Sequence, residues 1–127
     1  MTNVTITSTV RKNLPAAGYE EIVRDILGNR YLLSVVFIGD KRAKKLNAVY
    51  RKNTKPANVL TFPLTDIEGE LFINLAKVRR QAKRYGFTPT QYARYLLIHG
   101  CLHLKGYTHG STMEEAEDVL VEKYILR

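Results

Sequence analysis

Three histidines lie close together near the end of the chain, and the sequence contains no others. They are His99, His103 and His109, within the segment LLIHGCLHLKGYTHG at residues 96–110. Two histidines four residues apart on a helix project from one face, about one turn apart, so that both imidazoles can reach a single ion. This spacing predicts a metal site, and zinc, with nitrogen ligands at roughly 2.0–2.1 Å, is the first candidate.

The third histidine follows a helix stop, because Gly106 is expected to end the helix that carries the first two. The turn GYTHG is short enough to bring His109 back toward that helix. Three neutral nitrogen donors with a vacant fourth position are typical of a catalytic zinc site, whereas a structural site normally has four protein ligands. Cys101 is two residues from each helical histidine and therefore points to the opposite side, so we expect a small buried residue there.

The residue after His99 helps to decide which class of bond the metal site could hydrolyse. Metalloproteases with the pattern H-E-x-x-H carry a glutamate at that position as general base, and here it is Gly100. Peptide hydrolysis is therefore disfavoured. Zinc alone can lower the pKa of bound water to about 7 and polarise a phosphoryl oxygen. A phosphodiester also has a better leaving group than an amide, so it is the more suitable substrate.

Charge is distributed unevenly along the 127 residues, whose net charge is +8. Residues 41–84 contain twelve Lys and Arg against three acids, net +9, whereas residues 110–127 contain two bases against five acids, net −3. A concentrated basic segment is typical of proteins that bind nucleic acid. A merely solubilising surface is the alternative.

Composition indicates one soluble domain spanning residues 1–127. A single cysteine excludes an internal disulfide framework and favours a reducing compartment. The N-terminal residues lack the apolar run of a signal peptide, and no stretch approaches the roughly 18 apolar residues of a membrane span. We therefore expect a cytoplasmic protein.

Local patterns predict strands and helices in mixed order, which indicates an α+β fold with one sheet. Strands are expected at residues 3–10, 31–39 (buried on both faces), 58–64 and 69–74. Helices are expected at residues 15–28, 40–53, 75–86, 88–105 and 113–126.

Capping residues mark several helix starts. Asp40 and Asn74 are predicted N-caps, Thr88 with Gln91 forms a capping box, and Ser111 with Glu114 forms a second one. The predicted helix 75–86 has a basic outer face and an apolar stripe made of Leu75, Val78, Ala82 and Tyr85. The histidine-bearing helix is apolar nearly all round, which predicts that it lies in the interior, with Tyr92 used for packing.

Several segments resemble the YbeY family of bacterial endoribonucleases. HGCLHLKGYTH is similar to that family's signature H-G-x-L-H-L-x-G-Y-D-H. Upstream, LNAVYRKNTKPANVLTFPL is similar to its block L-N-x-x-Y-R followed by T-D-V-L-S-F-P, and GELFIN with QAKRYG is similar to the segment between them. The resemblance covers about Leu46 to His109.

The resemblance implies a single mixed sheet with helices, and a zincin-like arrangement with the histidine motif on a central buried helix. It implies one zinc ion held by His99, His103 and His109, and a functional arginine at Arg51, which can hold the scissile phosphate. It further implies cleavage of single-stranded RNA in the maturation of small-subunit rRNA, and contact with the ribosome or its assembly proteins. The basic helices at residues 41–52 and 75–85 are then expected to bind the RNA backbone.

Three positions depart from the family pattern. Thr108 and Asn58 stand where the family has aspartates, and Ala57 replaces a threonine. A carboxylate at position 108 could orient a ligand histidine or activate water, so its loss predicts altered tuning rather than loss of the metal. Two alternatives therefore stay open: a non-catalytic ribosome-associated RNA-binding factor with a structural zinc, and a zinc hydrolase acting on peptides or small esters.

Overall fold

The computed structural model describes residues 3–11, 14–51 and 57–126, except for the side chain of Arg51. In these residues the strands are β1 (Val4–Ser8), β2 (Leu32–Ile38), β3 (Val59–Thr65) and β4 (Glu68–Asn74). The α-helices are α1 (Tyr19–Leu27), α2 (Asp40–Arg51), α3 (Leu75–Gln81), α4 (Pro89–Lys105) and α5 (Ser111–Val121). A 3-10 turn, η1 (Ala82–Tyr85), follows α3, and a π turn, η2 (Glu122–Leu126), follows α5.

The four strands form one mixed sheet in the order β1-β2-β4-β3. β1 runs parallel to β2 and β2 parallel to β4, whereas β3 pairs antiparallel with β4 as a hairpin. The register aligns Val35 of β2 with Leu71 of β4, and Leu71 in turn with Thr61 of β3. The predicted α+β class with a single mixed sheet is confirmed.

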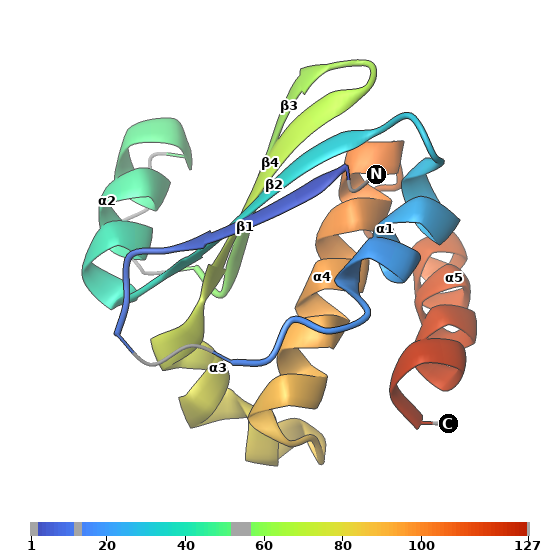
Figure 1. Ribbon diagram of the computed structural model, residues 1–127. Coiled ribbons are helices and arrows are strands. Elements are labelled where there is room, and N and C mark those ends of the chain that lie inside the picture. Colours follow the sequence, from blue (N-terminus) through green and yellow to red (C-terminus); the bar gives the residue numbers. More distant parts are fainter. Residues whose placement is uncertain (1–2, 12–13, 52–56, 127) are drawn as a thin grey trace.

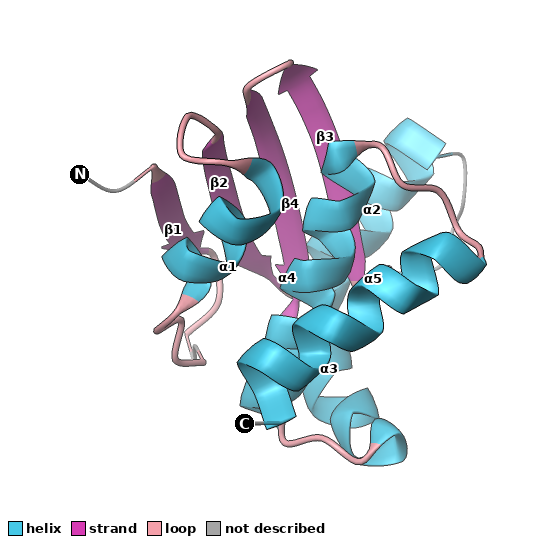
Figure 2. Ribbon diagram, turned by 90° about the vertical axis from the view of Figure 1, so that its right-hand side faces the viewer, coloured by secondary structure: helices cyan, strands magenta, loops and turns pink. Residues whose placement is uncertain are grey.

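Helices cover the two faces of the sheet unequally. Figure 1 shows α2 on one face and α1, α3, α4 and α5 on the other, and Figure 2 views the sheet from the side of these four helices. The main core lies between the sheet and α1 and α4; its fully buried members include Val35, Phe37, Leu71, Ile73, Leu97 and Ile98. The face under α2 is only partly covered, because Ser34 and Val36 of β2 are half-buried. The expectation that this strand is buried on both faces is therefore wrong.

Local signals at both ends define α4, the helix that carries two of the histidines. Thr88 Oγ1 accepts from the backbone N–H of Gln91 at 3.2 Å, and Gln91 Oε1 accepts from the backbone N–H of Thr88 at 2.9 Å. This is the predicted capping box, with Pro89 at the first helical position. Gly106 ends the helix with φ of 116°, a conformation that only glycine adopts easily.

α4 approaches the sheet closely at Gly100. A Cβ atom at this position would collide with Leu71 Cδ1 of β4 and would lie 3.2 Å from Thr61 Cγ2 of β3. Because both neighbours belong to the packed sheet, glycine is required if the helix is to keep this distance. The position at which a metalloprotease carries its glutamate is thus closed by the sheet.

Two predicted features of the later helices are wrong. Ser111 does not form a capping box, because α5 already begins at Ser111, with Gly110 as its N-cap and no side-chain cap bond. Tyr85 does not continue the buried stripe of Leu75, Val78 and Ala82; its side chain is 55% exposed. The helix tightens to 3-10 geometry after Gln81, which changes the direction of later side chains.

Two helix starts also differ from expectation. The helix expected at residues 15–28 begins only at Tyr19, after Gly18 with φ of 86°. Asp40 is the first residue of α2 rather than its N-cap, and its carboxylate bonds to another helix. It accepts from Asn74 Nδ2 at 2.8 Å and from Arg80 at 2.6 and 3.0 Å. None of the helices in the described ranges is long and apolar enough to span a membrane.

Candidate metal centre

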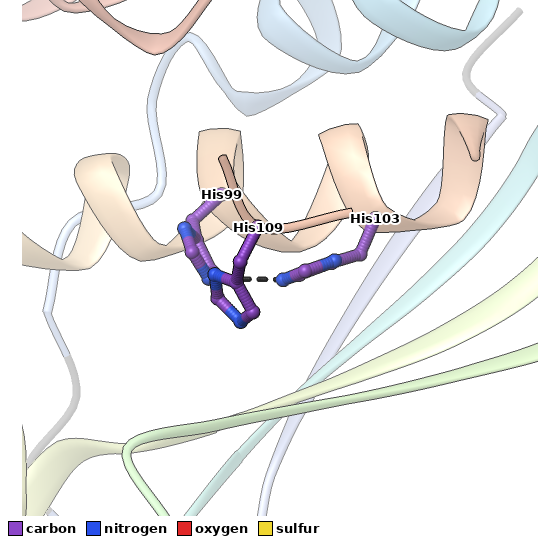
Figure 3. A group of neighbouring side chains, drawn as sticks. All are labelled: His99, His103 and His109. Atoms are coloured by element: carbon purple, nitrogen blue, oxygen red, sulfur yellow. Dashed lines mark hydrogen bonds between the residues drawn. The ribbon is translucent and has the colours of Figure 1, made fainter. Parts of the chain in front are cut away.

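The three histidines converge on one point, as the spacing predicted. Each offers a ring nitrogen, and these nitrogens all lie within 4.8 Å of one another. Figure 3 shows His99 and His103 projecting from the same side of α4, and the ring of His109 meeting them there. The ring centroid of His103 lies 4.6 Å from that of His99 and 4.8 Å from that of His109. The arrangement is compact enough for one ion.

The outer nitrogens of the two helical histidines are held by hydrogen bonds. His99 Nδ1 lies 3.2 Å from Glu117 Oε2, and His103 Nδ1 lies 3.1 Å from the backbone carbonyl oxygen of Tyr107. A carbonyl and a carboxylate oxygen accept, so both Nδ1 atoms carry the proton and donate it. Each neutral ring then has an unprotonated Nε2, the form that binds metals.

The two Nε2 atoms face each other at 3.1 Å. With both Nδ1 atoms donating, two neutral rings would direct repelling lone pairs at each other here, so the contact requires either a proton on one of the two Nε2 atoms or a metal ion. A cation among the rings removes that repulsion, and two nitrogens bound to one tetrahedral zinc lie about 3.3 Å apart. The donor set therefore fits a zinc ion.

His109 completes the cluster from the turn after α4. The turn folds back because the backbone N–H of Tyr107 donates to the carbonyl of Leu102 at 3.0 Å and the chain reverses at Gly106. His109 is exposed, whereas His99 and His103 are half-buried. The cluster is therefore open to solvent on the side of His109. In the described residues the group contains three protein donors, which leaves a further position for water or substrate.

Glu117 is a site residue that sequence reasoning missed. It belongs to α5, is 7% exposed, and holds His99. Burial raises its pKa, but the hydrogen bonds that it accepts from His99 and Tyr95 outweigh burial and lower it. The carboxylate is therefore ionised and able to accept. A signal was present: Glu117 lies four residues after Met113, on the buried side of an otherwise acidic amphipathic helix.

The two positions at which the family has aspartates have different surroundings. Thr108 is exposed in the turn, next to His109. Asn58 lies just before β3 and donates from Nδ2 to the phenol oxygen of Tyr92 at 3.3 Å. The carboxylate that contacts a histidine of the cluster belongs instead to another helix, as Glu117 of α5.

Three further residues were given roles by the sequence: Cys101, Tyr92 and Arg51. Cys101 is fully buried, and burial raises the pKa of its thiol, so it stays protonated and apolar as expected. Tyr92 is 1% exposed and packs between other rings, which confirms the packing role. Arg51 is the last residue of α2, and its side chain lies outside the described part of the chain. Its phosphate role stays a prediction.

The basic residues occupy two helices that meet at one end. Lys41, Arg42, Lys44 and Lys45 of α2 are exposed on one face of the sheet. Arg79, Arg80, Lys83 and Arg84 are exposed on α3 and η1, beside the beginning of α4. The ion pair between Asp40 and Arg80 joins the two groups, at 2.6 Å. The two groups of basic residues therefore lie near each other at one end of the sheet.

Comparisons with known proteins point to one family. The family described as Endoribonuclease YbeY matches residues 3–126. A protein named Endoribonuclease YbeY from Burkholderia lata is 36% identical over 120 residues, which cover 90% of this chain and 70% of that protein. Its namesake from Acholeplasma laidlawii is 32% identical over 84% of this chain and 80% of its own.

A further relative and a solved structure complete the picture. The Endoribonuclease YbeY of Thermodesulfovibrio yellowstonii is 41% identical over 67% of this chain, and the match spans only 58% of that protein. The solution structure of TM1509 from Thermotoga maritima superposes with a TM-score of 0.65 at 27% identity, covering 94% of this chain and 87% of that one. The family match over nearly every residue, with the three histidines of its signature gathered at one point, shows that this chain belongs to the YbeY endoribonuclease family.

Proposed function

We propose that this protein is a zinc-dependent endoribonuclease that cleaves single-stranded RNA. The observation that carries the proposal is the pair of Nε2 atoms of His99 and His103, which face each other at 3.1 Å while both outer nitrogens donate elsewhere. That arrangement is prepared for a cation. His109 offers the third nitrogen, and the exposed side of the cluster leaves access for a substrate.

The residues of the chain hold and shape this centre. His99, His103 and His109 would bind the ion, while Glu117 and the carbonyl of Tyr107 fix the tautomers and ring directions of the first two. When bound, zinc supplies Lewis acidity, which lowers the pKa of water to about 7 and polarises a phosphoryl oxygen.

RNA rather than peptide is the substrate that the surroundings favour. The sheet closes the position beside Gly100, so the glutamate base of metalloproteases has no room there. The exposed Lys and Arg side chains of α2, α3 and η1 can neutralise RNA phosphates. Binding of this kind weakens steeply as the salt concentration rises. We further propose that Arg51 binds the scissile phosphate and offsets the charge that develops on it.

The biological setting follows from the family rather than from the geometry. We propose that the whole chain, residues 1–127, acts as one endoribonuclease domain in the cytoplasm. Its substrate would be precursor small-subunit rRNA, with further action in ribosome quality control. Its partners would be the ribosome or proteins that assemble it.

The test combines metal analysis with RNA cleavage. We expect the purified protein to contain about one zinc per chain and to cleave a single-stranded RNA oligonucleotide. His103→Ala should lose most of the zinc and the cleavage. Glu115→Gln, at an exposed position of α5 away from the histidines, is the matched control and should retain both.

Three outcomes separate the alternatives. Cleavage that persists in His103→Ala would rule out metal catalysis. A parent that binds zinc and RNA without cleaving, and whose thermal stability falls in His109→Ala, would identify an RNA-binding factor with a structural zinc. Turnover of peptide or ester substrates but not RNA would identify a different zinc hydrolase.

A further inference from the structure

A row of aromatic rings leads along α4 to the histidine cluster. Tyr92, Tyr95 and His99 share one face of the helix, and their centroids are spaced at 6.0 and 6.2 Å. Tyr85 of η1 extends the row beyond the helix: its ring lies 5.1 Å from that of Tyr92, with an angle of 12° between the planes. Because Tyr92 and His99 are seven residues apart, Tyr92 lies about 10 Å from His99 along the helix axis.

Tyr85 is the exposed end of this row. Its side chain is 55% exposed, whereas Tyr92 directly beneath it is 1% exposed. The ring of Tyr85 therefore packs on Tyr92, while more than half of the residue stays accessible to a ligand. Stacking on a buried and hydrogen-bonded neighbour holds the exposed ring in a fixed plane. A flat ring that is already ordered binds another flat ring at little entropic cost.

The charge around Tyr85 suits a polyanion. Lys83 and Arg84 precede it on the same turn, and both are exposed. Residues 71–113, which carry Tyr85 and the three histidines, contain no aspartate or glutamate, and the carboxylate that contacts the row from another helix, Glu117, is buried. A strand of nucleic acid between Tyr85 and the histidine cluster would thus meet no acid from this segment. Proteins usually bind single-stranded nucleic acid through aromatic ring faces combined with neighbouring Lys and Arg side chains.

We propose that Tyr85 stacks on an unpaired base of the RNA, a few nucleotides from the bond that is cleaved. Lys83 and Arg84 contact the flanking phosphates. The inference rests on the proposed function and adds the residue that recognises the single strand: a nucleobase within a duplex is already stacked and paired, so only an unpaired strand can offer one to this ring. Tyr85 is therefore a binding residue that selects unpaired RNA.

Binding measurements provide the first test. We expect Tyr85→Ala to weaken binding of a single-stranded RNA by about 5- to 100-fold, as is typical for loss of one stacked base, and to change binding of duplex RNA little. Tyr85→Phe retains the ring and should bind like the parent. Val119→Ala is the control, because Val119 is 68% exposed on the acidic helix α5. Thermal unfolding of each variant shows that the fold is intact.

Fluorescence provides a direct test of stacking, because the chain has no tryptophan. Tyr85→Trp places a single indole on the proposed platform, and Val119→Trp places one on the control surface. We expect single-stranded RNA to quench the first indole at once on mixing, before cleavage proceeds. Duplex RNA and inorganic polyphosphate should leave it unquenched, and the second indole should not respond to any of them.

The outcomes distinguish this inference from the function on which it rests. A parent that binds and cleaves RNA, with Tyr85→Ala equally effective, overturns the stacking role and leaves the proposed function intact. Quenching by polyphosphate equal to that by RNA also overturns it, since phosphate contact would then suffice. Failure of the parent to bind any RNA overturns the proposed function and the inference together.

Discussion

Glu117 Oε2 of α5 lies 3.2 Å from His99 Nδ1 of α4, which links two helices through the second nitrogen of a predicted metal ligand. Tyr95 also bonds to this carboxylate, and burial raises the pKa of the Tyr95 phenol, with the neighbouring charge of Glu117 acting in the same direction. The phenol is therefore a stable donor to Glu117. The three side chains form a chain of hydrogen bonds that fixes the His99 ring.

Removing this carboxylate should weaken metal binding without removing a ligand. We expect Glu117→Ala to lower zinc affinity about 10- to 100-fold, the usual effect of losing a partner of a ligand histidine. Glu117→Gln keeps one oxygen acceptor and should lose less. Competition with a chromophoric chelator measures the affinity, and Glu115→Gln is the exposed control on the same helix. Equal affinity in Glu117→Ala and the parent would contradict the role.

The capping box of α4 should contribute measurably to stability. Thr88→Ala removes the side-chain oxygen that accepts from Gln91, and we expect a loss of about 1 kcal/mol in the free energy of unfolding. Ser111→Ala should cost less than about 0.5 kcal/mol, because Ser111 lies inside α5 and caps nothing. Urea unfolding of both variants tests the difference. Equal losses would restore the second capping box that the sequence suggested.

Substitution at Gly100 should be destabilising although glycine is a poor helix former. We expect Gly100→Ala to cost about 1–3 kcal/mol, since the added methyl collides with Leu71. In an open helix position the same change would be favourable by about 1 kcal/mol, so the sign is diagnostic. Combination with Leu71→Ala vacates the space, and the double variant should lose less than the two single losses together. Strict additivity would argue against the contact.

Asp40 should make stability depend on pH in the acid range. Hydrogen bonds from Arg80 and Asn74 lower its pKa below the ordinary 3.8, so it binds its proton less readily when folded. Its stabilisation is then fully present above about pH 4 and is lost as pH falls through the lower folded pKa. The pair is exposed, so the contribution is at most about 1 kcal/mol.

The matched variant is Asp40→Asn, measured by thermal unfolding between pH 6 and pH 3 (roughly the range that brackets carboxylate titration). The parent should be the more stable at the upper end, and the two should converge toward the lower end. A constant difference across the range would mean that the ionisation of Asp40 does not contribute.

Features encoded within a few residues could be predicted from the sequence. The start and end of α4 follow from Thr88, Pro89 and Gly106, and the convergence of His99 and His103 follows from helix geometry. The α+β class followed from the order of periodic segments. The mixed sheet and the family followed from the resemblance rather than from periodicity.

Features that depend on distant packing could not be predicted. Glu117 reaches His99 only because α5 docks on α4; the helical pattern places Glu117 on the buried side of α5 but does not say which residue it contacts. The need for glycine at residue 100 arises from Leu71, which is far away in the chain. Tyr85 does not continue the apolar stripe, because the helix tightens to 3-10 geometry after Gln81. An argument from α-helical periodicity assumes constant geometry and cannot predict this change.

The bond from His103 to the carbonyl of Tyr107 ties a helix residue to the turn that presents His109. Part of the positioning of the metal-binding side chains is thus achieved when the chain folds, before any ion binds. Hydrogen bonds hold two of the donors, whereas the third lies on a short exposed turn. We expect His109 to be the donor that releases first, so the rate of metal exchange should depend on how firmly this turn is held.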